Sequence, residues 1–245
     1  MLHAAQQKRL SESEQGAFSF YHESHRLRAA MTKLEIIDRI LNPGIVAIIR
    51  ADSSEQLIDA AAALYEGGVT GMEVTMTTPN ALQVIGEVRK KFGEKVLIGV
   101  GSVLDTETAR AAILAGAEFV VTPVTRPEVI ALCNRYSKPI ASGAYTPTEA
   151  LTAHESGADF VKLFPADQLG PQYIKNILAP LPMLQIIPTG GVTPQTAESF
   201  IQAGCVALAA GSSLVSREIL KSGDWKKLSE LAAAFVEAVR KARGR

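Results

Sequence analysis

A short pattern recurs along the sequence: AGAEFVV at 115–121, SGADFVK at 156–162 and AGCVALA at 203–209. Each copy closes a helical pattern with glycine and then continues at once into a short β-branched or aromatic run. Glycine is typical of helix ends, because it readily adopts the left-handed backbone conformation found there. The recurrence therefore predicts that one helix–strand unit is used repeatedly.

The same alternation of strand and helix patterns extends from Gly44 to the end of the chain. The predicted strands are 45–50, 71–76, 97–103, 119–123, 139–144, 159–164, 185–189 and 206–210. Eight such units predict the α/β class and a (β/α)8 TIM barrel, which typically takes about 250 residues. A doubly wound open sheet is the competing architecture, but it usually carries a glycine-rich turn after its first strand, where Arg50-Ala51-Asp52 stand here.

Helix starts are predicted at Thr78-Pro79, Thr146-Pro147 and Thr193-Pro194, since the hydroxyl can cap the helix and proline suits its first position. MTKLEIIDRIL at 31–41 predicts an N-terminal helix. No long linker interrupts residues 31–245, so these residues are predicted to form one domain.

The polar segment 1–30 is predicted to be a disordered extension, or to precede a true start at Met31. It lacks the apolar core of a secretory signal, and no apolar run in the chain is long enough to span a membrane. A cytoplasmic protein is expected. Cys133 and Cys205 have no metal-ligand spacing and are expected to be buried free thiols.

The composition favours small-molecule partners. The chain is 47% hydrophobic but only 6% aromatic, which suits an aliphatic α/β core. Lys+Arg and Asp+Glu both total 25, so the zero net charge provides no field to attract nucleic acid.

Two charged residues are predicted to point into the barrel. Side chains alternate between the two faces of a strand, and Met72 and Val74 suit the face toward the helices. Glu73 must then face the barrel axis, and the same argument applied to the sixth strand turns Lys162 inward. A buried charge is costly unless it is paired, so the alternative to a catalytic role is a structural ion pair.

A lysine inside a barrel has a specific chemical use. Burial favours the neutral amine, which can attack a ketone and form an imine that accepts electrons. A nearby carboxylate can move protons during such a reaction. Lys162 and Glu73 are therefore a sufficient minimal set for aldol chemistry without a metal or another cofactor.

Glycine turns after the last two strands predict a phosphate site. Thr189, Gly190 and Gly191 follow strand seven, while Gly211 and Ser212 follow strand eight. Barrels often bind phosphate there through exposed backbone N–H groups. Arg50, at the end of strand one, is a candidate to bind a carboxylate, and Ser102, at the end of strand three, can assist it.

Five segments, in this order, resemble the 2-keto-3-deoxy-6-phosphogluconate aldolase family. They are MEVTMTT at 72–78, GVGSVL at 99–104, FVKLFPA at 160–166, GPQYIK at 170–175 and PTGGVTP at 188–194. The family also includes 4-hydroxy-2-oxoglutarate and 6-phosphogalactonate aldolases. The resemblance implies a class I aldolase on a (β/α)8 barrel, usually a homotrimer, that yields pyruvate and glyceraldehyde 3-phosphate.

Carried over by motif, the resemblance makes Lys162 the imine former and Glu73 the general acid/base. It places Phe164 beside the imine and Pro123 beside the pyruvate methyl group. It also assigns Gly190, Gly191 and Ser212 to the phosphate loops. Some family members have arginine where Thr77 stands and threonine where Ser102 stands, which leaves carboxylate binding open, with Arg50 as the candidate replacement.

Three rival functions remain at this point. The 6-phosphogalactonate aldolase activity differs only in the substrate epimer, and cleavage of unphosphorylated 4-hydroxy-2-oxoglutarate can accompany either activity. A barrel that serves as a non-catalytic scaffold or sensor is disfavoured because both Lys162 and Glu73 are present. A metal-dependent aldolase or epimerase needs histidine and acidic ligands at strand ends, which the sequence does not supply.

Overall fold

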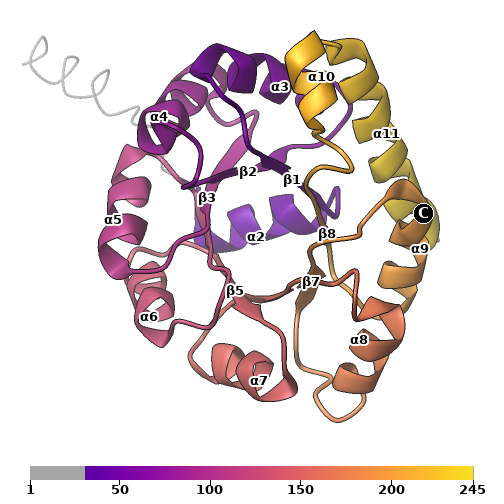
Figure 1. The fold of residues 1–245 in the computed structure, drawn as a ribbon. Coiled ribbons are helices and arrows are strands. Elements are labelled where there is room, and N and C mark those ends of the chain that lie inside the picture. Colours follow the sequence, from indigo (N-terminus) through magenta and orange to yellow (C-terminus); the bar gives the residue numbers. More distant parts are fainter. Residues whose placement is uncertain (1–30, 245) are drawn as a thin grey trace, which may run out of the picture. The chain divides into compact units, whose positions relative to one another are not determined.

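The computed structural model describes residues 31–244, so the predicted extension over residues 1–30 lies outside the described residues. Within the compact unit Lys33–Arg245, strands alternate with helices, as Figure 1 shows. The strands are β1 (Ile45–Ile49), β2 (Gly71–Thr75), β3 (Leu97–Gly101), β4 (Phe119–Val121), β5 (Ile140–Ala144), β6 (Phe160–Leu163), β7 (Ile186–Pro188) and β8 (Leu208–Ala210). The helices are α2 (Lys33–Leu41), α3 (Ser54–Glu66), α4 (Ala81–Phe92), α5 (Thr106–Ala115), α6 (Pro127–Arg135), α7 (Pro147–Glu155), α8 (Gly170–Leu178), α9 (Pro194–Gln202), α10 (Arg217–Ser222) and α11 (Trp225–Ala242).

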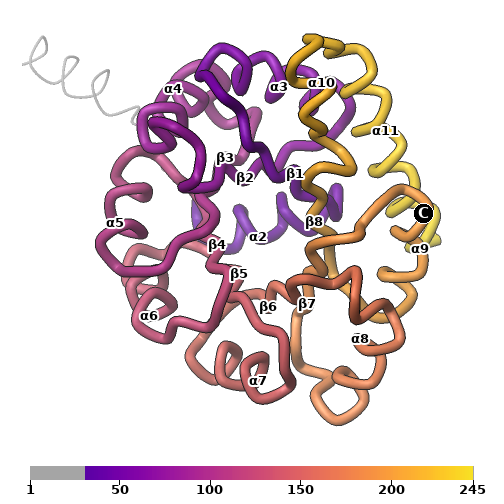
Figure 2. The backbone as a smooth tube through the Cα atoms, in the orientation of Figure 1, coloured from indigo at the N-terminus to yellow at the C-terminus, as the bar shows by residue number. Residues whose placement is uncertain are grey.

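The strands form a nearly closed parallel barrel. Their order along the sheet is β7-β6-β5-β4-β3-β2-β1-β8, and every neighbouring pair is parallel. A parallel bridge between Thr189, just after β7, and Ala209 of β8 joins the two ends of the sheet. The helices surround this barrel (Figure 2). The prediction of a (β/α)8 TIM barrel is therefore confirmed.

Side chains of β2 and β6 divide between two layers as their alternation predicts. Val74 and Leu163 belong to the apolar layer between strands and helices. Glu73, Phe160 and Lys162 instead line the barrel interior. The prediction that Glu73 and Lys162 point inward is confirmed.

Helix α2 lies across the end of the barrel at which the strands begin (Figure 1). Its Ile36 and Ile40 are buried, and Ile40 lines the barrel interior together with Phe119 at the start of β4. The amphipathic pattern of the segment explains this position, since its apolar face covers the apolar floor. A ligand must therefore enter at the opposite end of the barrel, where the strands end and where TIM barrels have their active sites.

Two of the three predicted helix starts are confirmed. The Thr146 hydroxyl accepts from the N–H of Glu149 at 3.3 Å, while the Glu149 carboxylate accepts from the N–H of Thr146 at 2.8 Å. The Thr193 hydroxyl caps α9 by accepting from the N–H of Thr196 at 3.2 Å. Both helices therefore begin where side-chain acceptors replace missing backbone acceptors.

The predicted helix start at Thr78-Pro79 is wrong. Helix α4 begins at Ala81, after Asn80 with its left-handed φ of 54°. Thr78 is buried, and its N–H donates to the Thr75 carbonyl at 2.9 Å, closing a turn after β2. Pro79 and Asn80 lie in a further turn, and proline suits the second position of a turn as well as the first position of a helix.

The strands are shorter than predicted, mainly at their carboxyl ends. Strand β3 ends at Gly101, so Ser102 follows the strand and does not end it, and Arg50 likewise follows β1. Val103 shows the reason, because it is fully buried although it lies outside β3. The apolar pattern reports burial, which continues past the last paired residue.

Candidate active site

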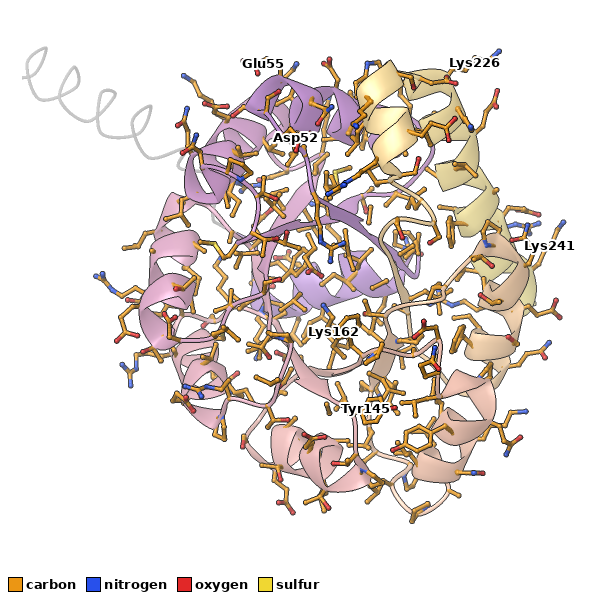
Figure 3. All side chains as sticks on the ribbon, in the orientation of Figure 1. Asp52, Glu55, Tyr145, Lys162, Lys226 and Lys241 are labelled. Carbon is orange, nitrogen blue, oxygen red and sulfur yellow. The ribbon has the colours of Figure 1, made fainter. Side chains whose placement is uncertain are left out.

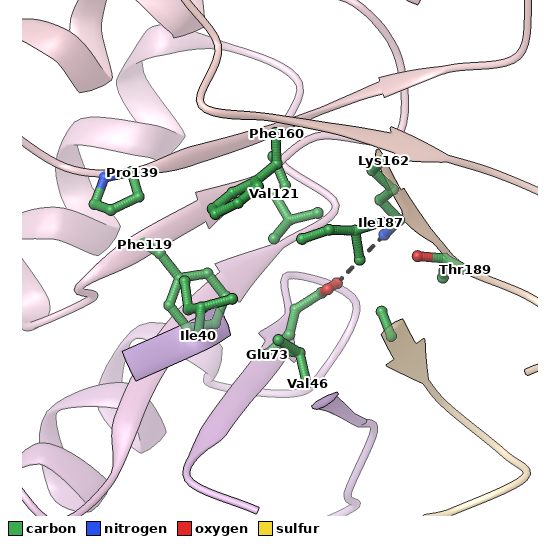
Figure 4. Close-up of a pocket in the computed structure, with 12 residues that line it drawn as sticks. Ile40, Val46, Glu73, Phe119, Val121, Pro139, Phe160, Lys162, Ile187 and Thr189 are labelled. Atoms are coloured by element: carbon green, nitrogen blue, oxygen red, sulfur yellow. Dashed lines mark ion pairs between the residues drawn. The ribbon is translucent and has the colours of Figure 1, made fainter. Parts of the chain in front are cut away.

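Lys162 and Glu73 face each other across the barrel interior. The Lys162 Nζ lies 3.7 Å from Oε1 of Glu73, and the side chains are 10% and 3% exposed. Figure 4 shows the two side chains reaching toward each other from β6 and β2, with Thr189 alongside. The predicted pair is therefore brought together at the carboxyl-terminal half of the barrel.

The geometry does not resemble an ion pair built for stability. The separation exceeds hydrogen-bond distance, and neither charged group makes a hydrogen bond to another described residue. A buried ion pair repays its desolvation only when further hydrogen bonds satisfy both groups. The loose contact therefore favours reactive groups over a structural pair.

Glycines of β3 give Glu73 its space, a feature that the sequence reasoning missed. A Cβ at Gly101 would overlap the Glu73 carboxylate, and one at Gly99 would overlap the Phe119 ring. Both glycines face inward, because residues two apart share a strand face. The signal was present in GVG at 99–101, since glycine within a strand often marks a close approach.

The cavity below the Lys162 amine is small. It has a volume of about 20 Å³ and an apolar floor that includes Ile40 and Phe119. This is room for about one water molecule. A substrate must therefore approach Lys162 from the hollows above it, at the carboxyl-terminal end of the barrel.

Phe164 and Thr189 border the Lys162 amine on that side. The Phe164 ring centroid lies 5.6 Å from Nζ, and the side chain is 41% exposed. Thr189 is 4% exposed, and its Oγ1 has no hydrogen-bond partner among the described residues. A buried hydroxyl without a partner is available to a ligand.

The glycine turns after β7 and β8 line one hollow of about 340 Å³, here called the glycine hollow. Gly190 and Gly191 have φ values of +96° and +67°, a conformation that favours glycine. The hollow unites predicted substrate-binding residues from distant parts of the sequence: Arg50, Phe164, Thr189, Gly190, Gly191, Gly211 and Ser212.

Arg50 lies beside the glycine turns. Its Nη1 is 3.5 Å from the position that a Cβ on Gly211 would occupy. The side chain lines the glycine hollow but does not line the cavity with Lys162 and Glu73. Its guanidinium therefore lies beside the glycine turn after β8.

The remaining predicted residues are dispersed around the same end of the barrel. Pro123 lines a hollow with Phe164, and the missing side chain of Gly143 allows the Pro123 backbone to pack against β5. Thr77 lines an outer hollow together with Arg50. Ser102 has a left-handed φ of 60° and lies in none of these hollows.

Two further features concern residues 31–244 only. No group of three or more His, Cys, Asp or Glu side chains is arranged there to hold a metal ion. Nor does any helix in this part of the chain have the length and apolar character needed to cross a membrane.

The fold and site together define a (β/α)8-barrel aldolase, a carbon–carbon lyase. The chain belongs to the KDPG and KHG aldolase family, whose model matches residues 36–231. It is 35% identical over 200 residues to the 2-dehydro-3-deoxy-6-phosphogalactonate aldolase of Escherichia coli, covering 81% of this chain and 95% of that protein. It is 32% identical over 210 residues to the 2-dehydro-3-deoxy-phosphogluconate aldolase of Treponema pallidum, covering 85% and 98% of the two chains.

A solved relative holds a reaction intermediate. The chain is 26% identical to the KDPG aldolase of Legionella pneumophila, with a TM-score of 0.75, over 80% of this chain and 96% of that one. That enzyme was captured with pyruvate as a covalent carbinolamine intermediate. A carbinolamine forms when an amine adds to a carbonyl, so this relative uses the chemistry that leads to a Schiff base.

Proposed function

We propose that this aldolase cleaves 2-keto-3-deoxy-6-phosphogluconate to pyruvate and glyceraldehyde 3-phosphate through an imine on Lys162. The observation that carries the proposal is the loose Lys162–Glu73 contact, 3.7 Å long, beside a hollow of glycine turns. Phe164 and Thr189 border the Lys162 amine and also line the glycine hollow, so a ligand in this hollow can reach the amine.

The reaction begins when the neutral Lys162 amine adds to C2 of the substrate. The carbinolamine loses water to give a protonated imine, with Glu73 moving the protons. Removal of the C4 hydroxyl proton breaks the C3–C4 bond, and its electron pair moves into the imine to leave an enamine. The aldehyde departs, the enamine takes a proton at C3, and water releases pyruvate from Lys162.

The substrate ends are bound by different groups. The backbone N–H groups of Gly190, Gly191 and Ser212 bind the phosphate, and Arg50 pairs with it. Phe164 and Pro123 enclose the pyruvyl part of the substrate. Thr189, beside Lys162, supplies a hydroxyl group to the substrate. Thr77 and Ser102 line neither the Lys162 cavity nor the glycine hollow and take no part in this binding.

A second candidate substrate is the C4 epimer, 2-keto-3-deoxy-6-phosphogalactonate. The Escherichia coli relative that bears this activity in its name is 35% identical to the chain. Both epimers need the same imine and the same phosphate contacts. Unphosphorylated 4-hydroxy-2-oxoglutarate is a slower substrate in this proposal, because it lacks the phosphate that the glycine hollow binds.

Two experiments test the proposal. Incubation with pyruvate and borohydride is expected to attach a reduced pyruvyl group at Lys162, which peptide mass spectrometry locates. Coupled pyruvate release then gives kcat/KM for both epimers, with the gluconate epimer expected to be preferred. Absence of the adduct would support a non-catalytic scaffold, and preference for the galactonate epimer would select the second candidate.

The assembly and location belong to the same proposal. The family resemblance implies a homotrimer, and a cytoplasmic location is expected from the sequence pattern. Light scattering coupled to size-exclusion chromatography measures the mass of the protein in solution. A mass equal to that of one or two chains would reject the trimer.

A further inference from the structure

A basic hollow lies next to the glycine hollow and shares Ile48, Arg50 and Ser212 with it, but its other lining residues have no part in the proposed reaction. It has a volume of about 540 Å³ and lies between the loops that follow β1, β2 and β8. Its ionisable lining groups are the cations Arg50, Arg217 and Lys221 and the single carboxylate Asp52. Thr77 and Ser212 add hydroxyl groups.

The cations of the basic hollow form no ion pair with any residue of the described segment 31–244. Among the described residues, no carboxylate lies within ion-pair distance of Arg50, Arg217 or Lys221. Neighbouring unpaired cations repel one another and attract anions strongly. The surplus positive charge therefore favours an anionic ligand in this hollow.

The hollows are connected in a fixed order. The Lys162 cavity shares Thr189 and Ala209 with the glycine hollow, which in turn shares Ile48, Arg50 and Ser212 with the basic hollow. The Lys162 cavity and the basic hollow share no residue. A chain that starts at Lys162 thus reaches the glycine hollow first and the basic hollow last.

Figure 3 agrees with this order. Lys162 lies near the barrel axis, whereas Asp52 lies near the ring of helices, between α3 and α10. The basic hollow, which Asp52 lines, therefore extends outward from the barrel axis.

We infer that the basic hollow is a second phosphate subsite for aldehydes longer than glyceraldehyde 3-phosphate. Arg217 and Lys221, together with Arg50, bind the terminal phosphate of a phosphorylated aldose of four or more carbons. The inference rests on the proposed function and extends its substrate class. Guanidinium and ammonium groups suit this task, because both form charge-assisted hydrogen bonds with phosphate oxygens.

The chemistry with such an acceptor is the reverse of cleavage. The pyruvate enamine on Lys162 adds through its methyl carbon to the aldehyde carbon, forming one C–C bond. The aldehyde oxygen takes a proton and becomes the new C4 hydroxyl. Water then releases the lengthened phosphorylated keto acid, and no other reactant is consumed.

The test compares aldehydes with pyruvate as the common donor. Aldol addition is measured with glyceraldehyde 3-phosphate, erythrose 4-phosphate and unphosphorylated erythrose for the wild type and for Arg217→Gln/Lys221→Gln. The ratio of kcat/KM for erythrose 4-phosphate to that for glyceraldehyde 3-phosphate is expected to fall by about tenfold in this variant. The control Arg135→Gln/Lys241→Gln makes the same charge change on the outer helices α6 and α11 and is expected to keep the wild-type ratio.

Two further measurements keep the outcome decisive. The wild type must prefer erythrose 4-phosphate over erythrose, and the single variant Lys221→Gln must lower the same ratio in part. An unchanged ratio in the double variant, or an equal fall in the control, would overturn the inference. Pyruvate trapping at Lys162 is recorded for every variant. Absence of the trapped imine in the wild type would mean that the proposed function is wrong. An intact imine with an unchanged ratio would mean that this inference alone is wrong.

Discussion

At the scale of single residues, imine chemistry at Lys162 depends on the small number of polar groups around its amine. Glu73 is its nearest carboxylate, and Phe164 contributes an aromatic ring. The other side chains of the interior cavity are apolar, apart from Thr189. No second lysine lines this cavity, so the imine has one possible position.

The first prediction concerns Lys162→Ala. This variant is expected to form no borohydride-trapped pyruvyl adduct and to lose nearly all cleavage, because no other amine can reach the substrate carbonyl. Mass spectrometry and coupled pyruvate release measure the two effects. Substantial cleavage by the folded variant would assign the nucleophile to another residue.

The second prediction separates imine formation from proton transfer. Glu73→Gln is expected to trap pyruvate but to exchange its methyl protons more slowly by about 10²–10⁴-fold, since a positioned base is lost. Proton NMR in deuterium oxide follows the exchange. If the exchange rate matched that of the wild type, Glu73 would not be the base.

The third prediction concerns the substrate group that Arg50 binds. Arg50→Gln is expected to lower kcat/KM for the phosphorylated substrate by about tenfold or more, because a charge-assisted contact is lost. Cleavage of 4-hydroxy-2-oxoglutarate is expected to change much less. An equal fall for both substrates would mean that Arg50 binds the carboxylate that both of them carry.

Gly191 is a poorer choice for testing the phosphate site. Its φ is +67°, and an added Cβ would lie 2.5 Å from that of Asp167. A side chain here would move the loop after β6 that carries Phe164. The loss of phosphate binding could then not be separated from damage beside Lys162.

At the scale of secondary-structure elements, α7 is held by a capping box beside the active-site entrance. The Glu149 carboxylate accepts from the N–H of Tyr145 at 2.9 Å and from that of Thr146 at 2.8 Å. The Tyr145 hydrogen bond, followed by those of Thr146, lowers the pKa of Glu149 below its usual range. Tyr145 and Glu149 line the hollow that contains Pro123 and Phe164, so this cap supports the wall of the site.

The fourth prediction is the pH dependence of this cap. A carboxyl group with a lowered folded-state pKa stabilises the protein above its unfolded pKa of about 4.3, and this contribution is lost as pH falls through the folded-state pKa. Glu149→Gln is expected to lower the free energy of unfolding at pH 7 by about 0.5–1 kcal/mol. Urea denaturation should show the difference shrinking toward pH 3.

A matched control for that measurement is Glu66→Gln, since Glu66 is exposed at the end of α3. It is expected to change the free energy of unfolding little at either pH. A Glu149 effect that stayed constant down to pH 3 would mean that the carboxylate charge does not stabilise α7.

At the scale of the whole barrel, the two thiols report on global packing. Cys133 and Cys205 are both buried and unpaired. Burial raises the pKa of each to about 12. The reactive thiolate is therefore scarce at neutral pH, and both thiols lie in the layer between the barrel and its helices.

The fifth prediction is that iodoacetamide labels neither thiol of the native protein at pH 7.5. Both thiols are expected to react in concentrated urea, because unfolding restores access and a pKa of about 8.5. Intact-protein mass spectrometry counts the labels. Fast labelling without urea would show that the layer opens locally, contrary to its tight burial.

The sequence by itself determined the architecture and the two central residues of the site. Repeated glycine-ended helices before β-branched runs predicted the barrel, since helix ends and strand burial are local properties of the chain. Alternation along β2 and β6 was enough to turn Glu73 and Lys162 inward. Residues two apart share a strand face whatever the rest of the fold does.

Only the tertiary structure decided which of the other polar residues act together. It placed Arg50 beside Gly211, and it left Ser102 outside the hollows. It also brought Arg217 and Lys221 into one basic hollow with Arg50, although about 170 residues separate them in the sequence. Loop conformation and long-range packing set these positions. Neither produces a periodic residue pattern that could be recognised in the sequence, because each depends on contacts between distant segments.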